Sequence, residues 1–272
     1  MGMYMLDKAK EKGVRVYQGE VLNIETDKQG VCAVLVARNN MIERITTRRF
    51  VNAAGPFLKQ IGNLLEVDIP VYPTLHEKIV IKDYLGIVPR STPMLILDDE
   101  QYIGWTEEEK EFWRQDNKYG KLLKKFPGGV YMRPEGGKDS QMLLIGWAYD
   151  DTVREPLWDP ILSEEFLEVV LRGATKLVPE LRQYIGKIAN PMHDGGYYTE
   201  SKENIPIIGP MRVDGAFIVG ALGGYGIMAG CAAGELGAAW VAASELPIYA
   251  QNFSFKRYDN PKYVPKRRSG KL

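Results

Sequence analysis

The sequence predicts an α+β chain, and three observations support this class. Residues 21–46 alternate apolar and polar side chains, as antiparallel strands do. Residues 216–220 are typical of a buried strand, which a glycine-rich turn connects to a helix-favouring run ending near Glu245. The charged stretch 106–125 and the apolar periodicity of residues 163–177 predict amphipathic helices between these parts.

Composition places few limits on function. The 272 residues can form one large domain or two. Lys plus Arg equals Asp plus Glu at 35 each, so no overall charge attracts the chain to nucleic acid. Cys32 and Cys231 lie far apart in apolar stretches, which predicts reduced, buried thiols and a cytoplasmic protein. We expect no secretory signal, no transmembrane segment and no metal site.

The N-terminal part is predicted to be a helix followed by strands. Residues 6–12 are typical of the end of a helix, which Gly13 terminates, and residues 14–17 are predicted to form a strand. Further antiparallel strands, with a turn at Asn39 and Asn40, are predicted over residues 21–26, 30–36 and 42–46.

A buried strand is predicted to begin at Phe50. It breaks at the small residues Ala53, Ala54 and Gly55 and continues as a helix. By the residues alone, the break indicates only that another backbone or a flat ligand comes close.

The middle of the chain is predicted to contain strands and two helices. Thr106 is the expected cap of the first helix, over residues 106–125, and Ser163 that of the second, over residues 163–177. The strands predicted here are residues 94–97 and a hairpin of residues 130–137 and 142–147.

Gly223, Gly224 and Gly226 predict a tight turn between a strand and a helix. The first helical turn leaves N–H groups unpaired and carries about half a positive charge, so it stabilises an electron-rich ligand edge. No lysine follows the glycines, so a flat, weakly anionic ligand fits better than a triphosphate. A closely packed strand-to-helix connection is the alternative.

Three stretches together resemble one family. They read Gly196-Tyr197-Tyr198-Thr199, then Asn204-Ile205-Pro206-Ile207-Ile208-Gly209, then Gly220-Ala221-Leu222-Gly223-Gly224-Tyr225-Gly226-Ile227. This run is similar to the C-terminal flavin signature of the glycine/D-amino-acid oxidase superfamily of FAD-dependent oxidoreductases. That superfamily includes sarcosine- and dimethylglycine-oxidising enzymes.

The resemblance implies FAD as the cofactor. Val21 occupies the position that the family places against the adenine, although an ordinary strand valine is the alternative. Ala53, Ala54 and Gly55 match the family's second flavin motif. The glycine turn and the helix after it would lie against the pyrimidine edge of the flavin and stabilise its reduced form. The residues implied there are Gly223, Gly224, Tyr225, Gly226, Ile227 and Met228.

The resemblance also implies a substrate side. Residues 71–81 resemble the strand that enters the family's substrate domain, and His76 on it is expected either to face the flavin or to be a surface or core histidine. Arg133 is expected to grip a substrate carboxylate or to form a structural ion pair. Tyr198 stands where amino-acid-oxidising relatives often carry an arginine; a phenol cannot neutralise charge, so simple glycine or D-amino acid oxidation is disfavoured. Gly196 stands where sarcosine-oxidising relatives carry a flavin-linked cysteine.

The sequence departs from the family at one point. The family opens with Gly-x-Gly-x-x-Gly on the first strand of a Rossmann unit, which holds the FAD pyrophosphate. No such motif occurs here. We therefore expect a truncated gene, a split gene whose partner chain supplies that half, or a remnant.

These inferences predict a partial FAD-binding domain of the glutathione-reductase-like kind and an antiparallel-sheet substrate domain. The expected function is FAD-dependent oxidation of the C–N bond of a small amine or amino acid. The alternatives are a non-catalytic remnant, a subunit that needs a partner chain to bind FAD, and a peripheral quinone-linked flavin dehydrogenase. The expected divisions are 1–69 and 194–250 for the FAD-binding domain, 70–193 for the substrate domain, and 251–272 for a tail with a frayed basic end.

Overall fold

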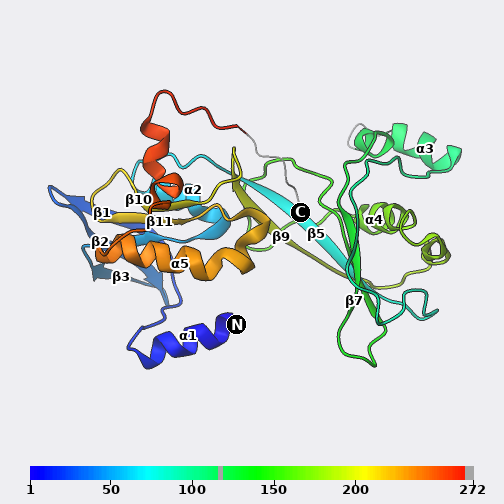
Figure 1. The fold of residues 1–272 in the computed structure, drawn as a ribbon, viewed down its shortest axis with the longest axis horizontal. Helices are drawn as coiled ribbons and strands as arrows, with labels where there is room; N and C mark the ends of the chain where they lie inside the picture. The colour runs from blue at the N-terminus through cyan, green and yellow to red at the C-terminus, as the bar shows by residue number, and fades with distance from the viewer. Residues whose placement is uncertain (116–118, 267–272) are drawn as a thin grey trace. The chain divides into compact units, whose positions relative to one another are not determined.

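The computed structural model describes residues 1–115 and 119–266, which form two compact units (Figure 1). The first unit consists of residues 1–71, 205–221 and 226–265, and the second of residues 72–204 and 222–225. Helices and largely antiparallel sheets make up both units, which confirms the α+β class. The domain bounds predicted from the sequence remain predictions, and the predicted frayed end falls mostly on residues 267–272, outside the described residues.

One sheet of the first unit is an antiparallel meander in the order β1-β2-β3. Asn39 and Asn40 form the tight turn between its last two strands with φ of 50° and 61°, a conformation that asparagine tolerates better than most residues. The predicted antiparallel strands are confirmed. The strands are β1 (Glu20–Asp27), β2 (Gly30–Arg38) and β3 (Met41–Thr46).

The other sheet of the first unit has the order β10-β11-β4 and contains a parallel pair. Its strands are β10 (Ile207–Pro210), β11 (Ala216–Gly220) and β4 (Phe50–Asn52). β11 runs parallel to β4, with Ala216 opposite Phe50 and Ile218 opposite Asn52. A 3-10 turn (Gly55–Phe57) and helix α2 (Leu58–Asn63) follow β4, as predicted.

Helix α5 (Gly226–Ala242) packs against this second sheet. It buries Ala233, Leu236 and Gly237, and the absent side chain of Gly237 makes room for Val219 of β11. An apolar core joins the two sheets to a 3-10 turn (Phe255–Asp259), and the C-terminal helix α6 (Ala250–Phe253) contacts β10.

Two predictions for the first unit are wrong. Helix α1 (Gly2–Glu11) ends at Gly13 as expected, but residues 14–17 form no strand, since no described strand pairs with them. Cys32 is half-buried and Cys231 is exposed, because Cys231 lies on the face of α5 turned away from the sheet. Both thiols are free.

The second unit is built on one sheet in the order β6-β7-β8-β5-β9. Its strands are β5 (Val71–Lys82), β6 (Leu95–Leu97), β7 (Val130–Glu135), β8 (Met142–Gly146) and β9 (Met192–Ser201). Along β5, every second residue from Val71 to Ile81 is buried, as period-two alternation requires. Ile79 and Ile81 join the core that α4 (Phe166–Ala174) also enters, so the opposite face of the sheet carries the partly exposed residues.

The helices of the second unit are shorter than predicted. Helix α3 (Glu107–Arg114) begins at a Thr106 capping box, as expected, but it ends well before residue 125. The Nε1 of Trp105 donates to the carbonyl of buried Leu122, which lies in a separate 3-10 turn (Gly120–Leu123). Residues 116–118 of the predicted helix lie outside the described residues.

Ser163 does not cap α4, because a buried carboxylate binds it. Glu77, 7% exposed, accepts hydrogen bonds from the Ser163 amide at 2.8 Å and the Ser163 hydroxyl at 2.7 Å. The same carboxylate lies 2.8 Å from Nε2 of His193. Glu165 occupies the N-cap position instead. This network ties β5, β9 and the entry to α4 together.

Asp150 makes the stability of the second unit depend on pH. Burial acts to raise its pKa, but hydrogen bonds from Lys121 at 2.7 Å and from Thr152 outweigh burial and hold the pKa well below its usual range. Because the pKa is lower in the folded state, the ionised carboxylate stabilises the fold at pH values above the ordinary pKa of about 3.9. This stabilisation is lost as the pH falls toward the pKa of the folded state.

Asp150→Asn is therefore expected to lower the free energy of unfolding at neutral pH by about 1–3 kcal/mol, the range for hydrogen bonds to charged groups. This difference in stability between the variant and the wild type should shrink below about pH 4, where Asp150 of the unfolded wild-type chain begins to take up a proton. Urea unfolding at several pH values measures both effects. Asp159→Asn, at an exposed aspartate, is the control. A deficit independent of pH would contradict the ionic explanation.

Candidate functional site

The parallel pair β4 and β11 places two helix-opening turns at one end of a sheet. Because parallel neighbours end at the same edge, the turn after Asn52 and the turn after Gly220 lie on the same side of the first unit. The crevice beyond the carboxyl ends of parallel strands is where ligands of α/β sheets bind. The sequence-predicted Ala53, Ala54, Gly55 and the start of α5 belong to these two turns.

The turn after β4 depends on glycine. Gly55 has φ of +57°, a left-handed conformation in which side chains with a Cβ are strained. A Cβ added there would meet no atom within 4 Å, so the space beside the turn is open. Buried Asn52 stabilises the turn, since its Nδ2 donates a hydrogen bond to the Leu58 carbonyl at 2.9 Å.

The turn after β11 is strained before its glycines begin. Buried Ala221 has φ of +55°, an unusual conformation for a residue with a Cβ, and such strain is concentrated at functional sites. Helix α5 then begins with Gly226, Ile227 and Met228, and the latter two are 95% and 71% exposed. Its first turn contains no acidic side chain that would satisfy the amide groups.

In the second unit, the structure brings three predicted residues together. The rings of His76 on β5 and Tyr198 on β9 stack with centroids 3.9 Å apart and an interplanar angle of 28°. The His76 Nε2 also lies 3.2 Å from the Thr74 hydroxyl. A Cβ on Gly224 would come within 2.9 Å of the Tyr198 ring, so only glycine lets the turn approach that ring. Gly223 and Tyr225 belong to the same 3-10 turn.

Arg133 is not part of this group of contacts. It is exposed on β7, and its Nη2 pairs with Glu135 at 2.8 Å. This is the structural ion pair that the sequence suggested as the alternative to gripping a substrate carboxylate. The register of β5, β8 and β7 puts Tyr131 and Arg133 on the same sheet face as Lys78 and His76. The guanidinium can bind a substrate carboxylate at that face only if its ion pair with Glu135 breaks.

Sequence reasoning missed Tyr131. Burial raises the pKa of its phenol, and the neighbouring Tyr198 raises it further. The phenol is therefore neutral at physiological pH and can act as a hydrogen-bond donor. Its alternation with buried Val130 and Met132 along β7 was the signal that could have placed it on the Tyr198 face.

The remaining predicted residue, Val21, lies near the start of β1 in the first unit and pairs with Val36. A register irregularity follows it between Val21 and Asn23, where the ladder is locally interrupted. Within the first unit lie Val21, Ala53, Ala54, Gly55, Gly226, Ile227 and Met228; within the second lie His76, Arg133, Tyr198, Gly223, Gly224 and Tyr225.

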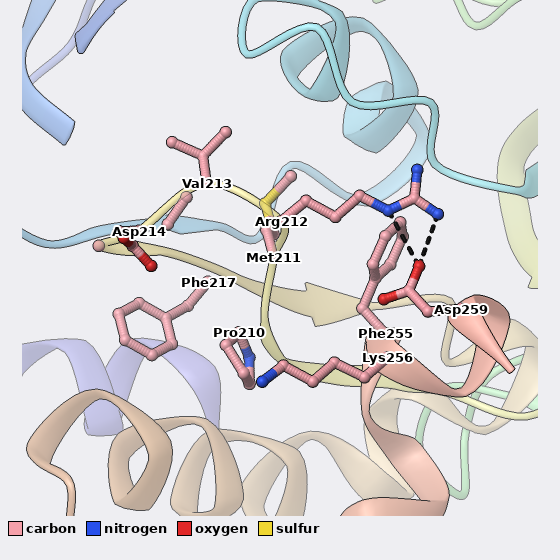
Figure 2. Close-up of a pocket in the computed structure, with 11 residues that line it drawn as sticks. Pro210, Met211, Arg212, Val213, Asp214, Phe217, Phe255, Lys256 and Asp259 are labelled. Atoms are coloured by element: carbon pink, nitrogen blue, oxygen red, sulfur yellow. Dashed lines mark hydrogen bonds and ion pairs between the residues drawn. The ribbon is translucent and has the colours of Figure 1, made fainter. Parts of the chain in front are cut away.

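A separate cavity of about 430 Å³ lies in the first unit between the β10–β11 turn and the 3-10 turn Phe255–Asp259 (Figure 2). Arg212 turns its guanidinium toward Asp259, with Nη2 at 2.8 Å and Nε at 3.1 Å from one carboxylate oxygen. The cavity shares no lining residue with the predicted flavin positions. We assign it no part in the reaction.

Comparison with known proteins identifies one family and similar proteins of that kind. The family model described as "DAO: FAD dependent oxidoreductase" matches residues 3–240. The mitochondrial dimethylglycine dehydrogenase of Mus musculus is 21% identical over 217 residues, which are 79% of this chain and 22% of that protein.

Two solved structures share the fold. L-proline dehydrogenase from P. horikoshii aligns with a TM-score of 0.65 and 22% identity over 93% of this chain and 57% of that one. Glycine oxidase from Geobacillus kaustophilus aligns with a TM-score of 0.61 and 19% identity over 94% and 55% of the two chains. The chain thus spans 22% of the length of its curated relative and just over half of each solved chain. Within the part of the chain that the structure describes, no helix combines the length and apolar character that crossing a bilayer requires.

Proposed function

Since the chain belongs to the DAO family of FAD-dependent oxidoreductases, we propose that it forms the substrate-binding and flavin-contacting part of an enzyme that oxidises the C–N bond of a small amine or amino acid. FAD is the cofactor of the family. This sequence contains no Gly-x-Gly-x-x-Gly turn, so the residues that hold the FAD pyrophosphate in the family have no counterpart within it.

One observation carries the proposal. The neighbouring parallel strands β4 and β11 both end in turns of small residues, and each turn opens a helix on the same side of the sheet. The start of α5 offers amide groups, and the small residues of both turns allow close backbone approach. This combination suits a flat, electron-rich ring better than a charged phosphate.

The residues present fit the flavin portion of the cofactor. The space beside Gly55 is open, and the apolar side chains of Ile227 and Met228 project into solvent, where a bound ring would cover them. The amides at the start of α5 would hold electron density on the ring edge. Val21 would lie on the adenine side, and Ala53 and Ala54 would let the ring approach.

When bound, FAD would supply the acceptor for the two electrons of C–N oxidation. The chain's own residues would bind and orient the substrate. Tyr198 donates one hydrogen bond, His76 fixes the Tyr198 ring by stacking, and Arg133 would hold a carboxylate after release from Glu135. None of these groups is placed as a general base, and removing hydride from a neutral amine requires little from one.

Two of the three reported relatives have names that support a substrate with an alkylated amino nitrogen, whereas the third, glycine oxidase, names a primary amine. Dimethylglycine and L-proline, which appear in two of those names, both carry carbon substituents on nitrogen. Tyr198 is consistent with such substrates, since it stands where a charge-neutralising arginine would favour simple amino acids.

The proposal is tested by the flavin spectrum of the chain, purified alone and after co-expression with a Gly-x-Gly-x-x-Gly polypeptide. We expect the yellow flavin band only in the second case, and anaerobic bleaching by dimethylglycine or proline. Tyr198→Phe should slow bleaching about tenfold, the cost of about 1.4 kcal/mol of lost hydrogen bonding. Tyr197→Phe is the matched control, since its hydroxyl instead accepts from the Leu157 amide. A chain that never binds flavin would favour the non-catalytic alternative.

A further inference from the structure

Lys78 of β5 lies on the same face of its sheet as the predicted substrate side chains. Successive side chains of a strand point to opposite faces, and buried Glu77 and Ile79, on either side of Lys78, belong to the core-facing set. Lys78 therefore shares a face with His76, two residues back along β5. Its side chain is 41% exposed, so a ligand can reach the ammonium group.

Glycines on both neighbouring strands leave Lys78 uncrowded. Gly146 of β8 is directly opposite Lys78, and Tyr131 of β7 is directly opposite Gly146, so the three residues form one row across the sheet. A Cβ on Gly146 would come within 2.4 Å of the Tyr131 ring, so the phenol leans over this glycine toward β5. On the other side, β9 adjoins β5, and a Cβ on Gly196 of β9 would meet no atom within 4 Å. Lys78 thus lies between a phenol on one side and open space on the other.

An ion pair fixes the ammonium group of Lys78 at this place. Its Nζ lies 2.7 Å from Oδ2 of Asp194 on β9, and this contact lowers the pKa of the Asp194 carboxyl. Asp194 alternates with Gly196 and Tyr198 along β9, so these three residues belong to one face. An ammonium group has three N–H donors, so Lys78 can bind a second anion without leaving Asp194.

We propose that Lys78 is a specificity-determining residue, which holds the substrate carboxylate on this face, next to Tyr131 and Tyr198. Lys78 supplies the positive charge that the two phenols lack, while the phenols donate hydrogen bonds. The inference rests on the proposed function and deepens it, because it narrows the substrate class to amino acids with a free carboxylate and excludes amines without one.

Lys78 is better placed than the other cation of this face, Arg133. The register puts Arg133 opposite Leu144, one same-face position beyond the row of Lys78 and on the side away from His76. Along the strand direction, Lys78 is therefore one step of about 7 Å from His76, and Arg133 is two such steps away. Arg133 would contribute only once its ion pair breaks, whereas Lys78 requires no such change.

The test is an NMR titration of the full chain with N,N-dimethylglycine and with its neutral analogue N,N-dimethylglycinamide. This readout requires no flavin, since Lys78, Tyr131 and Tyr198 all belong to the second unit. We expect the carboxylate to bind about tenfold more tightly than the amide, and Lys78→Met to remove this preference. Lys78→Arg should keep it, because a guanidinium also binds carboxylates. Lys82→Met is the matched control, since Lys82 lies on the same strand and face but opposite Met142.

In the flavin-loaded protein, Lys78→Met should raise KM for dimethylglycine about tenfold, more than it lowers kcat. An unchanged preference in Lys78→Met, equal loss with Lys82→Met, or no binding of dimethylglycine would overturn the inference. Loss of the preference with Arg133→Met alone would overturn it too, and would assign the carboxylate to Arg133. If the preference depends on Lys78 but no amine bleaches the flavin, the carboxylate site is supported and the proposed function is contradicted instead.

Discussion

Replacing Trp147 with alanine is expected to lower the free energy of unfolding by about 3–5 kcal/mol, the range for deleting a large buried aromatic side chain. Trp147 follows β8 and is 1% exposed. Its ring lies 5.0 Å from that of Phe126, and its Nε1 donates to the Pro127 carbonyl at 3.2 Å. On the other side, the ring occupies the space left by the missing side chain of Gly173 in α4. Removing it leaves a cavity between sheet and helix and a carbonyl without its donor.

Urea unfolding followed by circular dichroism measures this loss. Trp158→Ala is the matched control, because Trp158 is 91% exposed and its removal should change stability by less than about 0.5 kcal/mol. A loss at Trp147 as small as that at Trp158 would show that the sheet and α4 do not pack through this ring.

The local elements of this fold could be predicted because their signals are local. The antiparallel strands of residues 20–46 and the Asn39-Asn40 turn between two of them each depend on neighbouring residues, and both are present in the structure. The capping box at the start of α3 is likewise local, since Thr106 and Glu109 form it within one helical turn. In each case, the residues that determine the structure are the residues that form it.

The errors arise where a distant partner decides the outcome. Ser163 has the composition of a helix cap, but Glu77, distant in sequence, binds its amide and hydroxyl. Residues 14–17 have the composition of a strand but have no neighbouring strand, and a strand exists only through pairing. Cys231 lies in an apolar run, yet the face of α5 that carries it is exposed.

The candidate site shows the same division. The glycine turn and the Ala53-Ala54-Gly55 break could be recognised from sequence, because each is a continuous motif. The stacking of His76 on Tyr198 could not, because it requires β5 and β9 to be neighbours. The role of Arg133 could not be decided either, since its pairing with Glu135 depends on rotamers rather than on composition.

Replacing Gly55 with valine is expected to weaken FAD binding by the assembled protein about a hundredfold, or by about 2.7 kcal/mol. Two effects add at this position. Gly55 has φ of +57°, which a β-branched residue resists, and the added side chain would fill the open space beside the turn where the ring is proposed to lie. FAD fluorescence titration of the co-expressed protein measures the change.

Gly86→Val separates strain from ligand exclusion. Gly86 has φ of +64°, and a Cβ there would also meet nothing within 4 Å, but it lies in a loop of the second unit away from every predicted flavin residue in sequence. Both valine variants should lose similar stability, about 1–2 kcal/mol, because both force a β-branched residue into the left-handed region. Only Gly55→Val should weaken FAD binding. Equal FAD affinities in the two variants would mean that the turn after β4 serves the fold alone, and the flavin would then have to bind without it.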